Sequence, residues 1–66
     1  MNVLVNGVST EVQEGTSILN FVIKKGLKPG TVVVELNLDI VPREKWDTVF
    51  LTQDDQMQIV SFVGGG

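Results

Sequence analysis

The chain has 66 residues and contains neither cysteine nor histidine, which limits how it can be held together. Domains of this size bury only about 60% of the surface that their unfolded chain exposes, and many need disulfides or a structural metal. Without cysteine there is no disulfide and no thiolate zinc site, and without histidine the commonest metal ligand and general base is missing. A single domain held by apolar packing is therefore expected, and 42% hydrophobic residues make it feasible.

The charge pattern argues against nucleic acid and membranes as partners. The formal net charge is −3, and the five basic residues form two small groups instead of a continuous face that could neutralise phosphates. These residues are Lys24, Lys25, Lys28, Arg43 and Lys45. The first residues lack a basic leader and no apolar run reaches the length of a bilayer, so a cytoplasmic location is expected.

The first half of the chain predicts a β-hairpin followed by a helix. Asn6-Gly7 separates two β-rich runs, and both central residues of a type I′ turn need a positive φ, which this dipeptide tolerates. The returning strand is predicted over residues 8–13. Helical spacing then begins, with a cap at Thr16 or Ser17, and predicts about ten residues ending at Gly26. The expected buried face of the helix is Ile18, Leu19, Val22 and Ile23.

The second half predicts further strands. Residues 31–36 are apolar on both faces, which predicts a central strand covered by the helix on one side. A turn, a short strand at 40–41 and a helical turn at 43–47 follow, then an extended piece at 48–51. The last strand is predicted over 56–63, with Met57 and Ile59 facing one way and Val60 and Phe62 the other.

This order predicts an α+β fold of the β-grasp, or ubiquitin-like, type. In it, a mixed sheet has one main helix packed on one face, and the first and last strands lie side by side at the sheet centre. The β-grasp domain is expected to span residues 1–63, and residues 64–66 to form a flexible C-terminal glycine tail.

Three glycines, Gly64, Gly65 and Gly66, follow the last strand. An extended chain covers about 3.3–3.6 Å per residue, so this tail could carry the terminal carboxylate about 10 Å beyond the strand. Because glycine has no Cβ atom, such a filament fits a narrow channel of a partner enzyme. This arrangement suits activation of the carboxylate by joining it to AMP. The alternative is that the glycines are a disordered end with no function.

Several motifs resemble the ThiS family, the sulfur carriers of bacterial thiamine biosynthesis. The resemblance covers nearly the whole chain and rests on Asn6-Gly7, on Asn37, on the segment Ile40-Val41-Pro42-Arg43-Glu44-Lys45-Trp46, on the Asp55 turn and on Val63-Gly64-Gly65-Gly66.

The resemblance implies that the chain is a protein co-substrate and not an enzyme, and that it binds no cofactor. An E1-like (ThiF-like) enzyme would use ATP to adenylate Gly66. A cysteine-derived donor would convert the adenylate into a thiocarboxylate, and thiazole synthase (ThiG-like) would receive the sulfur. Gly65 would be the characteristic neighbour of Gly66, whereas Gly64 is less diagnostic.

In carriers of this kind the open face of the sheet is an apolar docking patch, so Val60 and Phe62 are candidate docking residues. We expect Trp46 to be packed in the core, and Arg43 and Glu44 to lie in a solvated turn; a contact of these two with the activating enzyme is the alternative. Other readings are the small subunit of molybdopterin synthase, another ubiquitin-like sulfur carrier, or a non-covalent interaction module. An enzyme is disfavoured because no paired catalytic constellation and no nucleotide or metal loop is present.

Overall fold

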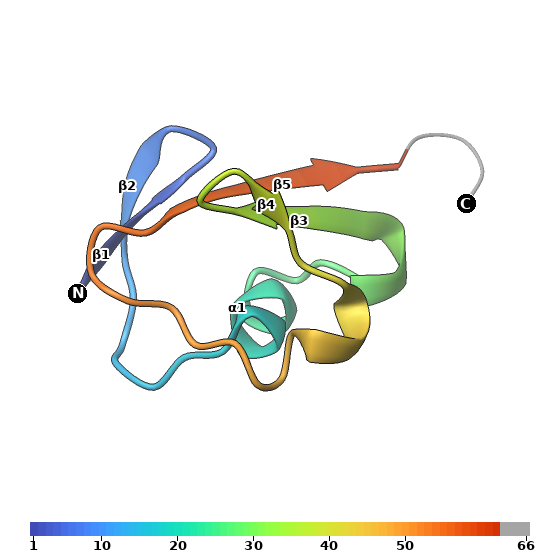
Figure 1. Ribbon diagram of the computed structural model, residues 1–66, viewed down its shortest axis with the longest axis horizontal. Coiled ribbons are helices and arrows are strands. Elements are labelled where there is room, and N and C mark those ends of the chain that lie inside the picture. The colour runs from blue at the N-terminus through green and yellow to red at the C-terminus, as the bar shows by residue number, and fades with distance from the viewer. Residues whose placement is uncertain (63–66) are drawn as a thin grey trace.

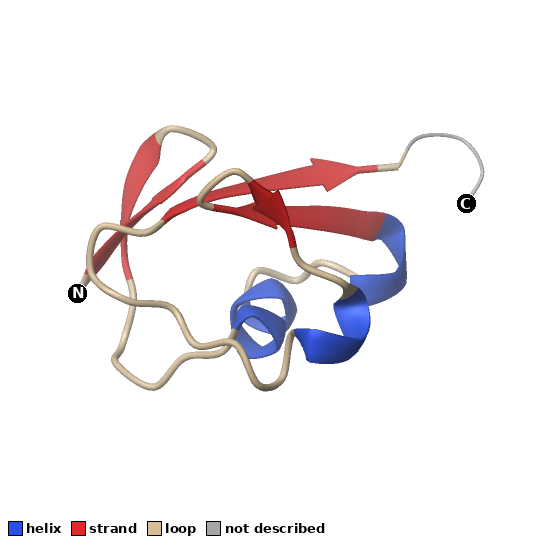
Figure 2. Ribbon diagram, viewed as in Figure 1, coloured by secondary structure: helices blue, strands red, loops and turns tan. Residues whose placement is uncertain are grey.

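The computed structural model describes residues 1–62, which form a five-stranded mixed sheet with one α-helix packed on one face (Figures 1 and 2). The strands run in the order β2-β1-β5-β3-β4. The elements are β1 (Asn2–Val5), β2 (Val8–Glu11), α1 (Ile18–Lys24), β3 (Val32–Leu36), β4 (Asp39–Ile40) and β5 (Gln56–Ser61), with short 3₁₀ helices η1 (Pro29–Thr31) and η2 (Arg43–Lys45). The predicted α+β architecture of the β-grasp type is confirmed.

The first hairpin forms as its sequence predicts. Val5 pairs with Val8 across a two-residue loop, and Asn6 and Gly7 have φ values of 51° and 83°. Both values lie in the left-handed region that a type I′ turn requires. The strand assigned as β2 ends at Glu11, two residues earlier than predicted, although the Val12 amide still donates to the Met1 carbonyl.

Helix α1 begins and ends at well-defined caps. The Ser17 hydroxyl accepts a hydrogen bond from the Asn20 amide, which satisfies one free N–H of the first turn. At the other end Gly26 adopts a φ of 78°, its amide donates to the Ile23 carbonyl, and the Leu27 amide donates to the Val22 carbonyl. This pair of bonds is a Schellman motif. The motif closes the helix after seven residues, so the predicted length of about ten was too long.

The prediction of the buried helix face was partly wrong. Ile18 and Val22 are buried and Leu19 is partly buried, but Ile23 is 55% exposed and Phe21 is buried in its place. Residues 18, 21 and 22 satisfy helical spacing as well as residues 18, 22 and 23 do. The choice between the two faces depends on how the helix is rotated against the sheet, which the local pattern does not specify.

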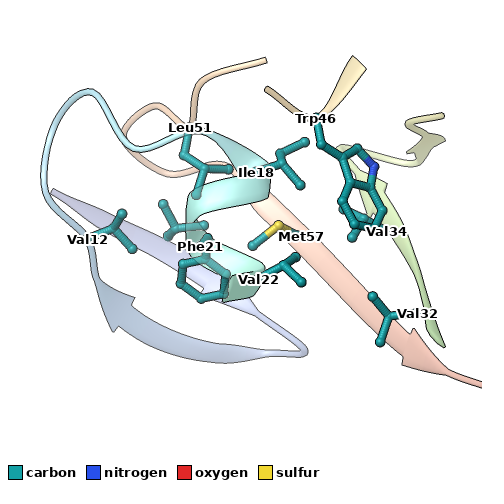
Figure 3. Packing of buried hydrophobic residues seen from close by; sticks show 10 residues of the cluster. Val12, Ile18, Phe21, Val22, Val32, Val34, Trp46, Leu51 and Met57 are labelled. Atoms are coloured by element: carbon teal, nitrogen blue, oxygen red, sulfur yellow. The ribbon is translucent and has the colours of Figure 1, made fainter. Parts of the chain in front are cut away.

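The core lies between α1 and the sheet (Figure 3). Side chains from the helix meet Val3 of β1, Val34 of β3 and Met57 of β5, all at most 1% exposed. Trp46 follows η2 and is also buried, as expected, and its indole Nε1 donates to the Val41 carbonyl at 2.8 Å. The buried hydrophobic residues are Val3, Val12, Ile18, Phe21, Val22, Val32, Val34, Trp46, Leu51 and Met57. Packing therefore takes the place of the missing cross-links.

Strand β5 is the central strand of the sheet. It pairs in parallel with β1, where Val5 lies opposite Met57, and antiparallel with β3, where Val34 lies opposite Ile59. The expected adjacency of the first and last strands is confirmed. Strand β3 therefore lies one position away from the centre, between β5 and the short edge strand β4.

Two asparagines in left-handed turns fasten β5 to its neighbours. Asn6 and Asn37 both have a φ of 51°. The Asn6 carboxamide accepts from the Ile59 amide at 2.8 Å and donates to the Ile59 carbonyl at 3.3 Å. The Asn37 carboxamide accepts from the Gln56 amide at 2.9 Å. Asparagine tolerates this backbone conformation and carries a group that imitates a peptide unit, so each turn extends the bonding of the strand.

Several predicted strand ends shift by one or two residues. Thr31 belongs to η1, the short edge strand is Asp39–Ile40 instead of 40–41, and β5 ends at Ser61. Val63, the predicted last residue of β5, lies outside the described residues. The boundary between a domain of residues 1–63 and a tail of 64–66 stays a prediction for the same reason.

We predict that the Asp55 carboxyl makes the free energy of unfolding depend on pH. Burial raises the pKa of its carboxyl, but hydrogen bonds from the Asn37 side chain and from the backbone and side chain of Thr52 outweigh this and hold the pKa below its ordinary value of 3.8. A carboxyl with a lowered pKa in the folded state stabilises the protein fully above its unfolded pKa, and this stabilisation is lost as the pH falls through the folded pKa. Chemical denaturation from about pH 5 to about pH 2 should therefore show a shallower loss of unfolding free energy in Asp55→Asn than in the wild type. Equal slopes in Asp55→Asn and the wild type would contradict the assignment.

We predict that replacing Asn6 lowers the stability of the fold, even when the replacement is glycine. Asn6→Gly keeps the positive φ accessible but removes both hydrogen bonds to Ile59, so the unfolding free energy should fall by about 1–2 kcal/mol. Asn6→Ala should lose about 1 kcal/mol more, because alanine is strained in the left-handed region. Urea denaturation measures both changes. An Asn6→Gly protein as stable as the wild type would show that the carboxamide contributes nothing.

Candidate functional site

Strand β5 carries the chain toward the predicted tail. Its last paired residue, Ser61, lies opposite Val32, and the next amide, that of Phe62, donates to the Thr31 carbonyl at 2.8 Å. The backbone is therefore held in the sheet up to the last described residue. Gly64, Gly65 and Gly66 lie outside the described residues, so the role assigned to them stays a prediction.

The two candidate docking residues are exposed. Val60 is 59% exposed and Phe62 is 58% exposed, whereas Met57 is buried and Ile59 is partly buried. This alternation places Val60 on the face of the sheet opposite α1 and Phe62 two residues further along, as their strand pattern predicted. Large apolar side chains in water at adjacent positions are typical of an interaction surface. Their role in docking stays a prediction.

Two residues that sequence reasoning missed extend this apolar surface. Val33 lies opposite Val60 in the β3–β5 pair, and Ile40 of β4 is 69% exposed. Ile40 pairs with Glu35, which is on the same face as Val33 because the two are two residues apart on β3. We call Val33, Ile40, Val60 and Phe62 the tail-side patch. The sequence feature that could have placed Ile40 on this face is the turn at Asn37-Leu38. Once β4 is known to be an edge strand, this turn sets how β4 pairs with β3, and so the face on which Ile40 lies.

The patch is hollowed at one corner of the sheet. An open depression of about 350 Å³ lies where β3, β4 and η2 meet the end of β5. Its walls include Gly30, Val33, Ile40, Arg43 and Phe62. Arg43, which was expected in a solvated turn, is exposed at the rim of this depression.

Side chains that could ligate a metal are not clustered in the described part of the chain. Residues 1–62 contain no group of three or more His, Cys, Asp or Glu side chains arranged to hold a metal ion. Within this range no buried side-chain nitrogen or oxygen lacks a hydrogen-bond partner. The carboxyl with a shifted pKa, Asp55, is engaged in the turn before β5. The helix of this part of the chain is too short to cross a membrane.

Solved structures share both the fold and part of the sequence. The crystal structure of the thiamine biosynthesis protein ThiS from Geobacter metallireducens matches with a TM-score of 0.86 and 29% identity, over 100% of both chains. A solution structure of a thiamine biosynthesis protein from the same organism matches with a TM-score of 0.80 and 28% identity, over 100% of this chain and 88% of that one.

Curated relatives are much longer than this chain. A thiazole synthase of Magnetococcus marinus is 35% identical and one of Paramagnetospirillum magneticum is 30% identical, each over 66 residues. The match covers 100% of this chain but only 20% of either relative. The chain thus spans about one fifth of the length of the curated relatives it matches.

The family assignment comes from the sequence model that matches nearly the whole chain. That model, described as the ThiS family, covers residues 3–66 and so includes the three glycines. Its range also contains both asparagine turns, strand β5 and the tail-side patch. The resemblance noted in the sequence is confirmed, and the chain belongs to the ThiS family.

Proposed function

We propose that this chain is a sulfur carrier for the formation of the thiazole ring of thiamine. The observation that carries the proposal is the position of β5, the central strand, which leads past an exposed apolar patch directly into Gly64-Gly65-Gly66. Family membership supports it, because the ThiS family is a family of small carrier proteins. On this proposal the domain is a handle, and the reacting group is the carboxylate of Gly66.

The chemistry is supplied by partner enzymes. A carboxylate oxygen of Gly66 attacks the α-phosphorus of ATP, and pyrophosphate leaves. A hydrosulfide ion, whose sulfur is drawn from cysteine, then attacks the acyl carbon of the adenylate and displaces AMP, which leaves a thiocarboxylate. An E1-like, ThiF-like enzyme binds the nucleotide, and these steps take place in the cytoplasm. The carrier acts as a co-substrate and itself holds no cofactor.

Docking through the tail-side patch would supply binding free energy that offsets the entropy lost when a partner orders the tail. A glycine segment loses more conformational entropy than any other when it is fixed in a channel. Burial of apolar surface stabilises a complex by about 25 cal/mol per Å². Val60 and Phe62 therefore offset the ordering cost by packing against the partner, which leaves the bare glycines to enter its active site.

The curated relatives support thiazole synthase as the sulfur acceptor. Both are named thiazole synthase, and this chain matches one segment of each. A carrier that shares sequence with part of a synthase fits a working partnership between the two activities. The thiocarboxylate sulfur, which is ionised at neutral pH, would act as a nucleophile, and later hydrolysis of the acyl group would regenerate Gly66.

Intact mass spectrometry tests this function. The chain ending at Gly66 should gain the mass of an adenylyl group, which is AMP less one water, when it is incubated with ATP and a ThiF-like enzyme. With a sulfur donor it should instead gain the mass difference between sulfur and oxygen. Both changes should map to the C-terminal peptide. Deletion of Gly65 and Gly66, or addition of one alanine after Gly66, should abolish both, because the activated carboxylate is then absent or displaced.

The matched control is Glu14→Gln, which alters an exposed charge between β2 and α1. It should accept AMP as the wild type does, and all variants should unfold at similar denaturant concentrations because the buried core is built from residues between Val3 and Met57. Sulfur transfer by the alanine-extended chain, or partner function retained after loss of both glycines, would contradict the carrier role. The second result would favour a non-covalent interaction module.

A further inference from the structure

Arg43 occupies a defined place beside the tail-side patch. It is the first residue of η2 and lines the same depression as Val33, Ile40 and Phe62. Its side chain is exposed, and it is the basic residue that the structure places in that wall of the depression. A cation bordered by apolar side chains at one corner of the sheet distinguishes this surface from an ordinary solvated turn.

The backbone around Arg43 is rigidly supported. The Trp46 amide donates to the Arg43 carbonyl at 3.1 Å, and the Lys45 amide donates to the Pro42 carbonyl at 2.9 Å. The buried indole of Trp46 bonds to the Val41 carbonyl, and the Val41 amide donates to the Val34 carbonyl at 3.0 Å. The segment before and after Arg43 is thus tied both to the core and to β3.

The guanidinium itself lies close to Gly30 in η1. A Cβ atom added at Gly30 would lie 3.2 Å from Nη1 of Arg43, a separation tighter than most real Cβ contacts. Gly30 does not have a positive φ, so its backbone conformation does not demand glycine. The small residue therefore leaves room for the guanidinium against the wall of the depression. A larger residue at position 30 would displace the guanidinium from this position.

The chemistry of this position suits a carboxylate. A guanidinium presents a planar fork of N–H donors that matches both oxygens of an Asp or Glu side chain. The apolar neighbours would exclude water around such a pair once a partner covers them, and this strengthens the attraction. Arginine and aromatic residues are also enriched at the energetic centres of interfaces, as Arg43 and Phe62 would be here.

A nucleotide phosphate fits this position less well. Gly66 is the fourth residue after Phe62, so a tail drawn out by an enzyme would carry the reacting carboxylate about 13 Å beyond Phe62. Arg43 lies beside Phe62 and would stay at the base of the tail, where the partner's protein surface lies and not its ATP.

We propose that Arg43 is a specificity-determining residue that pairs with an Asp or Glu side chain on the docking surface of a partner protein, next to an apolar side chain that enters the depression. The inference rests on the proposed function, because it identifies what the tail-side patch recognises on the partner enzymes. It predicts an acidic group at the centre of the complementary surface of at least one of them.

Isothermal titration of carrier variants against the ThiF-like enzyme and against thiazole synthase, each without nucleotide, tests this inference. Arg43→Gln should weaken binding to at least one enzyme by about tenfold or more, because the partner carboxylate is left buried without its pair. Arg43→Lys should recover only part of the loss, since an ammonium cannot form the two-pronged contact. Lys45→Gln, which removes the same charge two residues away on η2, should change the dissociation constant by less than about twofold.

The possible results separate this inference from the proposed function. Equal affinity of Arg43→Gln and the wild type for both enzymes would overturn the inference, as would full recovery by lysine or an equal loss in Lys45→Gln. A loss that appears only when ATP is added would assign the arginine to a phosphate and would also overturn it. If the wild type binds neither enzyme and accepts no AMP, the proposed function fails as well. If Arg43→Gln binds normally while the wild type accepts AMP, only the inference on Arg43 fails.

Discussion

The pairing of β5 with both β1 and β3 is the interaction on which the rest of the structure depends. It joins the two ends of the described chain, since Val5 lies opposite Met57 and the Asn6 side chain bonds to Ile59, 53 residues away. A strand hydrogen-bonded on both edges is the most constrained position in a sheet, whereas edge strands present free backbone groups. Strand β5, which leads toward the glycines, is held by β1 at Gln56 and Met57, by β3 over residues 57–61 and by the Asn6 carboxamide at Ile59. The carrier function proposed here uses this rigidity as a platform.

The two faces of the sheet serve different purposes, and the division follows from the alternation along each strand. One face, with Val34 and Met57, is covered by α1 and supplies most of the stability of a chain that has no cross-links. The other face leaves Ile40, Val60 and Phe62 in water. Exposed apolar side chains contribute little to the stability of the isolated domain, and we propose that a partner protein covers them. A partner's surface, with a carboxylate that pairs with Arg43, would cover the face of the sheet opposite α1.

Local signals predicted most of the fold. The Asn6-Gly7 turn and the Gly26 cap demand particular backbone angles, and the alternation of residues 56–62 correctly separated Met57 from the exposed Val60 and Phe62. What failed depends on contacts between distant segments. The rotation of α1 decides whether Phe21 or Ile23 is buried, and the sequence pattern permits either. The bond from Asn6 to Ile59, the place of Ile40 in the patch and the closeness of Arg43 to Gly30 all require the assembled sheet. The glycine tail was identified from its composition and family resemblance, and it lies outside the described residues.

Amide hydrogen exchange followed by NMR tests the platform most directly. The Leu4 amide donates to the Asp55 carbonyl where β5 begins beside β1, whereas the Ile59 and Phe62 amides bond to the Asn6 side chain and the Thr31 carbonyl further along β5. If β5 is held along its whole length, all three amides should exchange with free energies close to that of global unfolding. Rapid exchange of Ile59 and Phe62 beside a slow Leu4 would show that the end of β5 frays, and it would contradict a rigid platform for the tail.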